Sequence, residues 1–512
     1  MSTSLAVPRP AVSWTAGGAP HSIEFDDRYA SDAGALHQSD AVFIAGCDLP
    51  ARWADHTGGS FGIGEIGFGF GVNLLNTWRR WCDQPDQPDR GATLHYLAFD
   101  RALPDAEAFD RALSVHPELT AFAGALRQSW PAPLRGSQRI FLSAPGLRPL
   151  WLTLVLGDIS ETLVQWAQTP RGWIDAWYFD GFAPARNPEL WSDDVFRAAV
   201  RLSRPGAAFA TFSAASRVRR GLEAAGFAVR KYPGFAGKRE RLAGELVRGG
   251  TRHCALGRFA RISGAGLAGS ALARALSRRG WSVEVVESSP DIGASQNPAA
   301  VLYPGFNDAS ARGELALSAL IHAQRSLAPQ LNACGCAILA QGRWARLADL
   351  KSVELPECSA RWCERNELSE RAGVRLPAGG LWLGRSGYLS IPQLVRARLD
   401  DPRIRLTDAA SADAAIEILC TPHRIGLDAQ IGVLHGFRGL SGGGDGGGTR
   451  QRAVLSGGGY LTPPDAEGWQ WVGAAHQREG DAEAANRARL GRWCTALEHN
   501  APAFQRRWSA TR

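Results

Sequence analysis

Apolar and polar residues follow two separate runs of strand and helix patterns, and each run begins at a glycine-rich junction. In the first, residues 61–71 are apolar and glycine-rich, and residues 72–81 place apolar side chains at helical spacing. In the second, residues 259–269 precede a helical pattern over 270–279 and an apolar strand over 281–287. Strands and helices that alternate in this way form parallel sheets covered by helices. We therefore predict the α/β class, with two doubly wound units.

The boundary between the two units is predicted near residue 255. A length of 512 residues exceeds the roughly 250–300 at which a single core stops growing. Residues 248–252 are polar, contain glycine and show no apolar periodicity, which is typical of a linker. The predicted domains are therefore 1–252 and 258–512. A glycine-rich stretch over 441–449 has almost no side chains to pack and predicts a surface loop.

The first glycine-rich junction contains the pattern Glu-x-Gly-x-Gly-x-Gly, formed by Glu65, Gly67, Gly69 and Gly71. Glycines let the backbone approach a ligand closely, and an acid at a strand end can hold a cationic or hydroxyl-bearing group. The spacing differs from that of dinucleotide sites and resembles the S-adenosylmethionine loop of Rossmann-type methyltransferases. A glycine-rich turn that only packs is the alternative interpretation.

Two further acids, Asp100 and Asp158, each end an apolar run. In doubly wound folds a carboxylate at such a position binds ribose hydroxyls, which we expect of Asp100. We expect Asp158, the third acid in chain order, to lie beside the adenine. For each acid a cap on the protein surface is the alternative.

Residues 174–191 combine an apolar strand with a loop that contains glycine and proline. The strand delivers Asp180 to its carboxyl end, where open α/β sheets place their chemistry. An amine that is methylated must be neutral and correctly oriented, and a carboxylate can accept its N–H or its proton. We predict that Asp180 is the catalytic-site acid, and that Asp175 caps an element or faces solvent.

The second junction has the full dinucleotide fingerprint. Gly264, Gly266 and Gly269 have the required spacing, and Glu287 follows about 20 residues later. A pyrophosphate is expected at the N-terminus of the following helix, with ribose hydroxyls on Glu287. Arg261 disturbs the pattern, because a charge in a buried parallel strand is costly unless it reaches an edge or a carboxylate.

Composition narrows the class of protein. Hydrophobic residues make up 45% of the chain and charged residues 21%, as in ordinary soluble proteins. The formal net charge of +7 is carried almost wholly by arginine, which fits a polyanionic partner, although GC-rich coding also explains it. Nine cysteines along the chain and the lack of a leader pattern predict a reducing, cytoplasmic location.

Two further classes are not expected. No apolar run is long enough to cross a membrane. Neither Cys334 with Cys336 nor Cys358 with Cys363 has the usual spacing of zinc ligands, so we expect no metal site.

Taken together, these segments resemble the bifunctional tRNA 5-methylaminomethyl-2-thiouridine biosynthesis family, MnmC, over nearly the whole chain. The resemblance rests on the first glycine loop, on Asp-Gly-Phe-Ala-Pro-Ala-Arg-Asn-Pro from residue 180, and on Phe-Asp-Asp-Arg-Tyr over 25–29. Further matching segments are 218–227, 234–240, 293–304, 387–392 and 459–463.

The resemblance implies two activities on the wobble uridine of tRNA. An FAD domain of the glycine and D-amino acid oxidase type removes the carboxymethyl group from carboxymethylaminomethyluridine, and the first domain then methylates the aminomethyl group with S-adenosylmethionine. Neither a membrane nor an obligate protein partner is implied. The resemblance also assigns tRNA phosphate contacts to a basic cluster whose alternative interpretation is a solvated face: Arg217, Arg219, Arg220, Lys231, Lys238, Arg239 and Arg241.

The chain departs from the family pattern in its second half. It stops at Arg512, where the family continues with Arg-Asp-x-x-Pro and Gly-Ser-Arg-Gly segments that help to close the flavin site, and 400–440 is shortened. We therefore expect a weakened or inactive oxidoreductase domain. The alternative function is a methyltransferase alone, with a vestigial flavin domain that binds tRNA.

Overall fold

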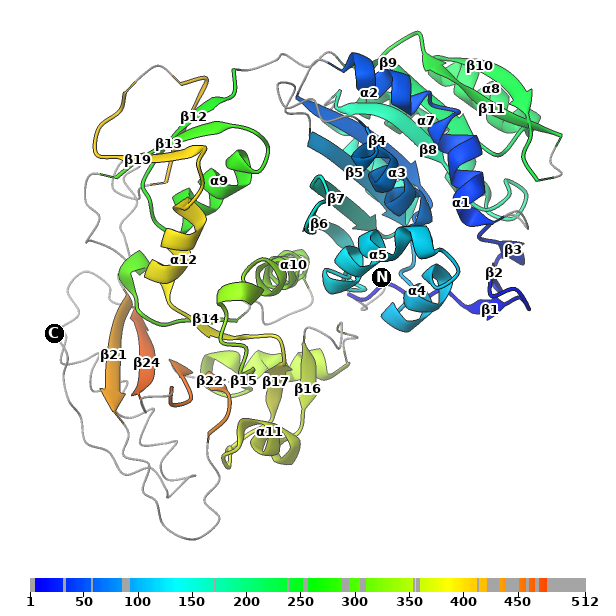
Figure 1. The fold of residues 1–512 in the computed structure, drawn as a ribbon. Helices are drawn as coiled ribbons and strands as arrows, with labels where there is room; N and C mark the ends of the chain where they lie inside the picture. The colour runs from blue at the N-terminus through cyan, green and yellow to red at the C-terminus, as the bar shows by residue number, and fades with distance from the viewer. Residues whose placement is uncertain are drawn as a thin grey trace. The chain divides into compact units, whose positions relative to one another are not determined.

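The structure is a computed structural model of the whole chain. It describes residues 5–30, 34–56, 59–84, 93–169, 172–236, 239–251, 257–287, 294–303, 310–352, 355, 360–411, 414–420, 432–438, 451–456, 460–465 and 469–476. The chain divides into two compact units (Figure 1). We call Ala6–Ala255 the N-terminal unit; the C-terminal unit comprises Leu256–Arg512 with Met1–Leu5.

An eight-stranded sheet forms the centre of the N-terminal unit, in the order β10-β11-β9-β8-β4-β5-β7-β6. The strands β7, β5, β4, β8 and β9 pair in parallel, whereas β6 and β11 run antiparallel to their neighbours. Their bounds are β4 (Ser60–Ile66), β5 (Thr93–Asp100), β6 (Gly136–Leu142), β7 (Leu150–Leu156), β8 (Ile174–Phe179), β9 (Ser203–Thr211), β10 (Phe227–Pro233) and β11 (Glu240–Leu246). A small sheet precedes them, formed by β1 (Val12–Trp14), β2 (Pro20–Ser22) and β3 (Asp27–Arg28).

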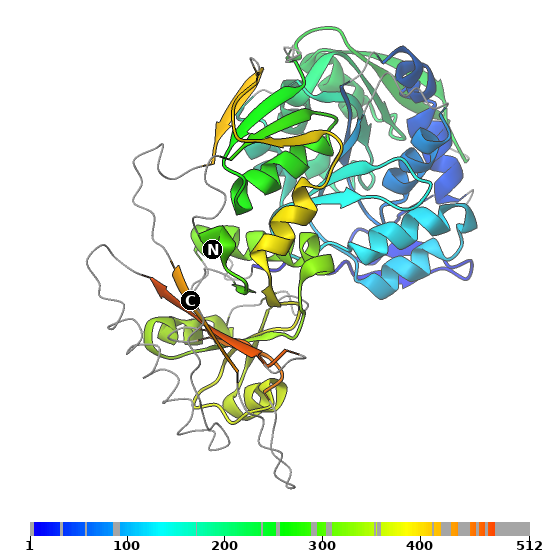
Figure 2. The same cartoon turned by 60° about the vertical axis from the view of Figure 1, so that its left-hand side comes forward.

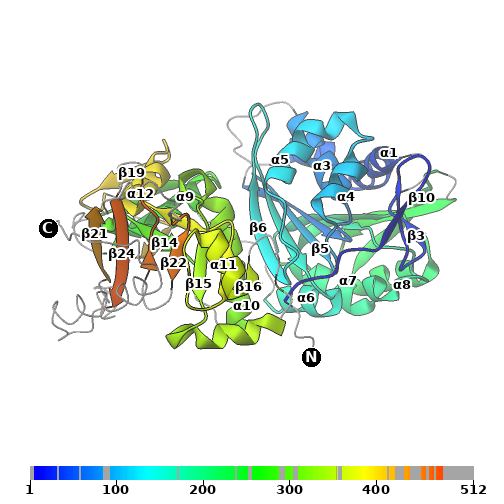
Figure 3. The same cartoon turned by 90° about the horizontal axis from the view of Figure 1, so that it is seen from below.

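Helices cover both faces of the large sheet and give the unit three layers (Figure 3). Successive side chains of a strand point to opposite faces, so Tyr96 packs in the cluster with α3, α4 and α5, while Leu97 packs in the cluster with α6, α7 and α8. The bounds are α1 (Ala35–Gln38), the π-helix η1 (Ser39–Ile44), α2 (Leu49–Asp55), α3 (Val72–Cys82), α4 (Ala106–Leu113), α5 (Thr120–Gln128), α6 (Ile159–Trp166), α7 (Asp193–Leu202) and α8 (Ser216–Ala225), with 3₁₀ turns at Pro117–Leu119 and Pro188–Trp191.

The C-terminal unit contains a four-stranded parallel sheet in the order β19-β13-β12-β20. One face buries Ile262, Val283 and Val285 in a core that also includes Ala273 of α9. The helix α12 packs beside α9 (Figure 2). The bounds are β12 (Phe259–Ser263), α9 (Leu267–Ser277), β13 (Ser282–Val286), α12 (Ile391–Leu399), β19 (Ile404–Thr407) and β20 (Ile416–Leu419).

The rest of the described part of this unit is built around a seven-stranded sheet in the order β16-β17-β15-β22-β23-β24-β21 and a strand pair, β14-β18. The predicted α/β class is therefore confirmed in both units. The remaining bounds are β14 (Ala300–Leu302), α10 (Ala311–Ser326), β15 (Cys336–Leu339), β16 (Arg361–Cys363), α11 (Arg365–Ala372), β17 (Gly380–Leu383), β18 (Gly387–Leu389), β21 (Gly432–Arg438), β22 (Val454–Ser456), β23 (Tyr460–Leu461) and β24 (Trp469–His476), with 3₁₀ segments at Ala294–Gln296, Ala328–Gln330 and Gly342–Ser352.

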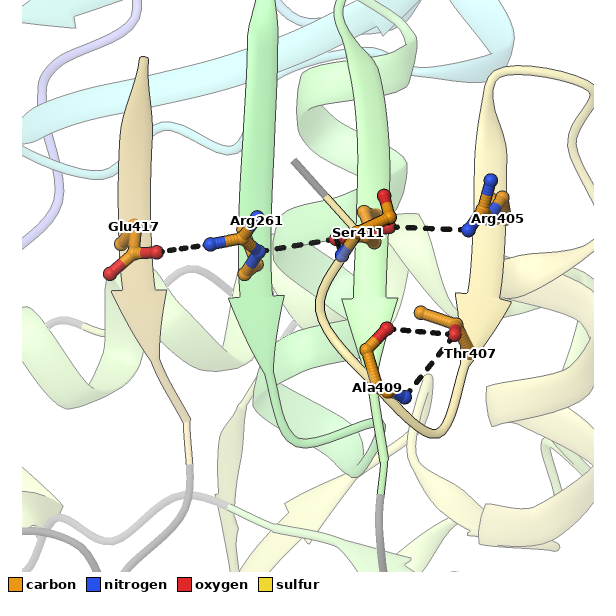
Figure 4. Close-up of polar contacts among 7 residues, drawn as sticks. Arg261, Arg405, Thr407, Ala409, Ser411 and Glu417 are labelled. Atoms are coloured by element: carbon orange, nitrogen blue, oxygen red, sulfur yellow. Dashed lines mark hydrogen bonds and ion pairs between the residues drawn. The ribbon is translucent and has the colours of Figure 1, made fainter. Parts of the chain in front are cut away.

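A row of alternating charges crosses the four-stranded sheet on the face that points away from its apolar core (Figure 4). Arg261 lies in register with Glu284 and Glu417, and it pairs with Glu284 at 3.1 Å and also with Glu417. Arg405 lies 3.6 Å from Glu284 on the other side. The backbone N–H of Ser411 donates to Glu284 at 3.2 Å, and the Ser411 hydroxyl donates to it as well. A charge in a buried parallel strand was expected to need a carboxylate partner, and Arg261 has two.

We expect Glu284→Gln to destabilise the C-terminal unit by on the order of 1–3 kcal/mol, because Arg261 and Ser411 would lose a charged acceptor. Hydrogen bonds from Ser411, and then from Arg261, hold the pKa of Glu284 below its usual value. Its stabilising contribution is therefore present above the unfolded-state pKa and is lost as the pH falls through the folded-state pKa. Hydrogen exchange of β12 and β13 in the full chain, followed by mass spectrometry across that pH range, measures both effects.

Glu417→Gln is the matched control, because the Glu417 side chain is 62% exposed and an exposed pair contributes little. Equal destabilisation by the two substitutions would contradict a special role for Glu284.

Candidate functional site

The strand order of the N-terminal unit reverses between β4 and β8. From β4 the chain continues to β5 and β7 on one side, and then to β8 and β9 on the other. In open α/β sheets, ligands bind outside the carboxyl ends of the strands at such a point. Glu65 is the last residue but one of β4, and Asp180 directly follows β8. The two predicted acids therefore meet at the point where the topology places a site.

The glycines of the first junction form a tight loop next to Asp180. Gly67, Gly69 and Gly71 all have positive φ angles, of 94°, 54° and 72°. A Cβ atom on Gly67 would lie 1.9 Å from the Asp180 carbonyl oxygen. Because that oxygen belongs to the backbone, it cannot move aside as the end of a flexible side chain could. Gly71 is also the N-cap of α3. The loop therefore needs glycine both for its conformation and for its approach to Asp180.

Glu65 and Asp180 share one hydrogen-bond donor, the side-chain amide of Asn73. Its Nδ2 atom lies 2.8 Å from Oε1 of Glu65 and 2.6 Å from Oδ2 of Asp180. Glu65 is fully buried. Burial first, and the charge of Asp180 second, raise the pKa of Glu65 well above its usual value. Asn73 was not predicted from the sequence, although its place in the first turn after the glycine loop is a signal that could have identified it.

Asp100 and Asp158 occupy different environments. Asp100 accepts hydrogen bonds from the backbone N–H of Gly69 at 2.8 Å and of Ala102 at 3.2 Å, and burial raises its pKa. Asp158 is exposed and caps α6, since its Oδ1 accepts from the backbone N–H of Ser160 at 2.8 Å. Both acids line the same cavity as Asp180. Asp158 therefore caps a helix, as the alternative interpretation expected, and also lines the cavity.

The expectation for Asp175 was wrong. It neither caps a helix nor faces solvent: its Oδ2 accepts the Gly62 backbone N–H at 2.7 Å, and its side chain is only 15% exposed. Arg204 donates to both of its carboxylate oxygens at 2.9 Å. Asp175 thus fixes the amino-terminal end of the β4–β8 pair, away from the site at the carboxyl end.

The segment over residues 24–29 forms one wall of the site. The Phe25 ring stacks on Phe182 with 4.7 Å between centroids, and the Tyr29 ring meets the edge of Phe182 at 5.1 Å. Asp27 accepts a hydrogen bond from the backbone N–H of Ala183 at 2.8 Å. These contacts hold the loop that follows Asp180 in one conformation.

A cavity of about 1140 Å³ joins these parts. It is lined by three of the predicted acids, Asp100, Asp158 and Asp180, and by Gly67, Gly69 and Asn73, whereas the buried Glu65 does not line it. The aromatic side chains of Phe25, Tyr29, Phe70 and Phe182 also line it. Its volume exceeds the range of roughly 300–1000 Å³ usual for one drug-sized ligand.

The predicted basic cluster lies on α8 and on the β10–β11 hairpin, and its members differ in exposure. Arg217, Arg220 and Arg239 are exposed. Two others are paired, Arg219 with Glu223 at 2.9 Å and Lys231 with Glu240 at 2.8 Å.

Arg241 is half-buried, with its guanidinium 5.1 Å from the centroid of the Tyr232 ring, and burial lowers its pKa. Lys238 lies outside the described residues. Ala236, in the loop between β10 and β11, lines the cavity, so this hairpin reaches the site.

The second glycine junction has the local geometry of a dinucleotide loop. Gly264 has a φ of 102°, and a Cβ atom on Gly269 would lie 1.8 Å from the Gly264 carbonyl oxygen, so α9 packs tightly against the turn. A Cβ on Gly266 would lie 2.7 Å from the Ser295 hydroxyl. Glu287 accepts a hydrogen bond from the backbone N–H of Ala265 at 2.8 Å. These residues fit the diphosphate and ribose positions of a dinucleotide.

Two other observations concern metals and membranes. Among the described residues, no group of three or more His, Cys, Asp or Glu side chains is arranged to hold a metal ion. The thiols of Cys334, Cys336 and Cys363 are free, and Cys358 lies outside the described residues. In the part of the chain that the structure describes, no helix combines the length and apolar character of a membrane span.

Two family models match the chain. One, described as S-adenosyl-L-methionine-dependent methyltransferase, matches residues 117–247. The other, described as FAD dependent oxidoreductase, matches residues 262–460. The two descriptions confirm the two cofactors predicted from the sequence.

Curated relatives match both units together, and each carries the name tRNA 5-methylaminomethyl-2-thiouridine biosynthesis bifunctional protein MnmC. The protein of Aeromonas salmonicida (strain A449) is 35% identical over 76% of this chain and 61% of its own length. That of Ectopseudomonas mendocina (strain ymp) is 37% identical over 82% and 66%. That of Cupriavidus metallidurans is 32% identical over 90% and 75%. The chain thus spans 61% and 66% of the length of the first two relatives.

We expect Gly67→Ala to abolish binding of S-adenosylmethionine, measured by calorimetry, because the new methyl group would displace either the loop or the Asp180 backbone. Gly146→Ala is the control: Gly146 also has a positive φ, of 76°, but its Cβ would meet nothing within 4 Å. Both variants carry the left-handed strain of about 1–2 kcal/mol. Retention of binding by Gly67→Ala at the level of the control would contradict this assignment of the loop.

Proposed function

Because this chain belongs to the family of bifunctional tRNA 5-methylaminomethyl-2-thiouridine biosynthesis proteins MnmC, we propose that it catalyses two successive steps on the wobble uridine of tRNA. In the first, FAD-dependent oxidation removes the carboxymethyl group from carboxymethylaminomethyluridine. In the second, the resulting aminomethyl group is methylated with S-adenosylmethionine. We place both steps in the cytoplasm, where tRNA is modified, and propose no obligate protein partner.

One observation carries the methyltransferase half of this proposal. Asp180 stands at the reversal point of the sheet, beside a glycine loop of the predicted type, in a cavity of about 1140 Å³. The cavity has room for a cofactor and for a second, flat ligand. We assign Glu65, Gly67, Gly69, Gly71 and Asp158 to the cofactor, with Asp100 on the ribose.

The side chains suggest how an amine would be prepared for methylation. When bound, S-adenosylmethionine supplies an electrophilic methyl group on a sulfonium. The Asp180 carboxylate accepts an N–H of the neutral aminomethyl group and so directs the nitrogen lone pair away from itself. Methyl transfer would form the N–CH₃ bond and break the S–CH₃ bond of the bound cofactor, and the sulfur would keep the electron pair. The nitrogen then loses one proton, and we propose that the Asp180 carboxylate accepts it.

The aromatic wall fits a nucleobase as the second ligand. Enzymes that modify a base take it out of the stack, and unstacked bases commonly lie against aromatic side chains. Phe25, Tyr29 and Phe182 line the cavity beside Asp180. We propose that Arg217, Arg219, Arg220, Lys231, Lys238, Arg239 and Arg241 contact tRNA phosphates, which set affinity and register.

For the oxidoreductase half, we propose that Gly264, Gly266, Gly269 and Glu287 hold FAD. When bound, FAD would accept the two electrons of the oxidation that converts the N–CH₂ single bond to C=N. Water would then hydrolyse this bond, which would leave the aminomethyl group on the uridine and release the two carboxymethyl carbons as an oxo acid. The match of residues 262–460 to an FAD dependent oxidoreductase does not favour the alternative of a methyltransferase with a vestigial flavin domain. The expectation of a weakened flavin domain stays a prediction.

Asp180→Asn should reduce methyl transfer to tRNA that bears aminomethyluridine by about 10²–10⁴-fold, because the general base contributes on this order. Affinity for S-adenosylmethionine should change little. Asp194→Asn, at a side chain that is 72% exposed, serves as the control. Labelled methyl transfer with and without ribonuclease treatment measures the effect. A wild-type protein that transfers no methyl group, or whose transfer survives ribonuclease, would overturn the proposal.

Purified wild-type protein should carry flavin, seen as its visible absorbance bands, and Gly269→Ala should lose it because of the contact with Gly264. Gly257→Ala is the control, since the nearest atom to its Cβ would be 3.6 Å away. Equal flavin content in both variants would contradict the assignment of Gly269 to the FAD site. A wild-type protein that cannot be loaded with FAD would contradict the oxidoreductase half of the proposal, and methyl transfer would then be the remaining proposed activity.

A further inference from the structure

Asn73 lies between two carboxylates that come from different strands. It is the second residue of α3, and its side chain is largely buried, with 9% of the residue exposed. Its single Nδ2 atom contacts Glu65 at the end of β4 and Asp180 after β8, at 2.8 and 2.6 Å. An amide nitrogen has two hydrogens, so it can donate one to each carboxylate.

Without such a donor the negative charges of the Glu65 and Asp180 carboxylates would repel each other. Like charges at one site raise the pKa of one partner, and the pair then holds a shared proton. Burial and Asp180 raise the pKa of Glu65, whereas the bond from Asn73 lowers it. The other titratable groups that act on Glu65 are Asp100 and Tyr96 on β5, and Tyr178 on β8. Asp100 raises the pKa of Glu65, whereas a hydrogen bond from the Tyr96 hydroxyl lowers it. Asn73 differs from these groups because its amide is neutral at every pH and donates to both carboxylates.

The helix that carries Asn73 is fixed against the strand that leads to Asp180. Thr77, one turn further along α3, hydrogen-bonds the Tyr178 hydroxyl at 3.0 Å. The α3 residues Leu74, Leu75 and Trp78 are fully buried. Two hydrogen bonds, one helical turn apart, thus set the register of α3 against the end of β8. The Asn73 amide is held in place by the core and does not depend on a ligand for its position.

We propose that Asn73 is a positioning residue for methyl transfer, which holds the Asp180 carboxylate in the orientation that receives the N–H of the substrate amine. This inference rests on the proposed methyltransferase function. Asn73 itself does not touch the reacting atoms in this account. It acts through Asp180, by separating the Asp180 carboxylate from that of Glu65 and by fixing the orientation of the Asp180 carboxylate plane.

The test compares Asn73→Asp with Asn76→Asp on the same helix. Asn76 is also buried and also donates to a carboxylate, Asp40 Oδ1 at 2.9 Å, but it does not line the cavity. Asn73→Asp places a third carboxylate beside Glu65 and Asp180, whereas Asn76→Asp places one beside Asp40, where Arg79 and Arg80 also lie. Asn73→Asp should therefore lose more stability in thermal unfolding, and the activities are compared at a temperature at which both variants are folded. Asn73→Ala is made in parallel, because it removes the donor without adding a charge and gives a second reading if Asn73→Asp fails to fold.

At saturating S-adenosylmethionine and aminomethyl tRNA, Asn73→Asp should lower kcat by about 10²-fold, the size of effect that a misplaced catalytic group produces. The pH of half-maximal activity should rise, because the carboxylate cluster then binds a proton more readily. Asn76→Asp should keep both values near those of the wild type. Equal kcat in the two variants, or a change confined to KM with an unmoved pH profile, would contradict the positioning role.

A second readout separates this inference from the proposed function. Binding of S-adenosylmethionine is measured by calorimetry as a function of pH in the wild type and in both variants. The pH at which affinity is half lost should rise in Asn73→Asp and not in Asn76→Asp. If the wild type methylates no tRNA but this shift appears, the proposed substrate is wrong and the role of Asn73 in the carboxylate cluster stands. If the shift is absent, the inference about Asn73 fails.

Discussion

The N-terminal unit is organised around a buried carboxylate that has another carboxylate as its neighbour. Glu65 is fully buried at the end of a central strand, and Asp180 lies across the same amide from it. A buried charge is costly unless hydrogen bonds compensate it, and a second like charge adds to the cost. The neighbouring residues compensate this cost. The glycine loop brings the backbone against Asp180, and the amide of Asn73 supplies the shared donor.

Other elements keep this arrangement in register. Asp175 and Arg204 tie the opposite end of β8 to β4, through the Gly62 backbone. The segment over residues 24–29 holds the loop after Asp180 by the Asp27 hydrogen bond and by the stack of Phe25 on Phe182. Each contact joins parts of the chain that are distant in sequence. The site is thus a product of the sheet topology and of packing, and the chemistry is concentrated where the strand order reverses.

The C-terminal unit also places charged side chains within a sheet, but there it pairs them with opposite charges. Its four-stranded sheet has an apolar core on one face and a charged row on the other, in which Glu417, Arg261, Glu284 and Arg405 alternate across the strands. Here opposite charges are neighbours, so each acid has a basic partner. Carboxylates that are paired in this way stabilise a sheet, whereas Glu65 and Asp180 in the N-terminal unit share a neutral amide donor, and Asp180 lines the cavity.

The sequence was sufficient for features that depend on local pattern, and insufficient for those that depend on pairing. Apolar runs that end in glycine or acid predicted both junctions and the places of Asp100 and Asp180 at the carboxyl ends of their strands, because strand ends and turns are encoded locally. The partners of Arg261 could not be predicted, because Glu284 and Glu417 become its neighbours only through the strand register. Asp175 was misjudged for the same reason, since Arg204 lies 29 positions away. Likewise, the sequence did not reveal that Arg219 and Lys231, which the family resemblance assigns to tRNA phosphates, have the acidic partners Glu223 and Glu240.

The most direct test of the account is the fate of tRNA that carries carboxymethylaminomethyluridine when it is incubated with the full chain loaded with FAD. Nucleosides from the digested tRNA are identified by mass spectrometry after reactions with and without S-adenosylmethionine. The account predicts methylaminomethyluridine when the methyl donor is present and aminomethyluridine when it is withheld. Unchanged carboxymethylaminomethyluridine in both reactions would contradict a two-step enzyme.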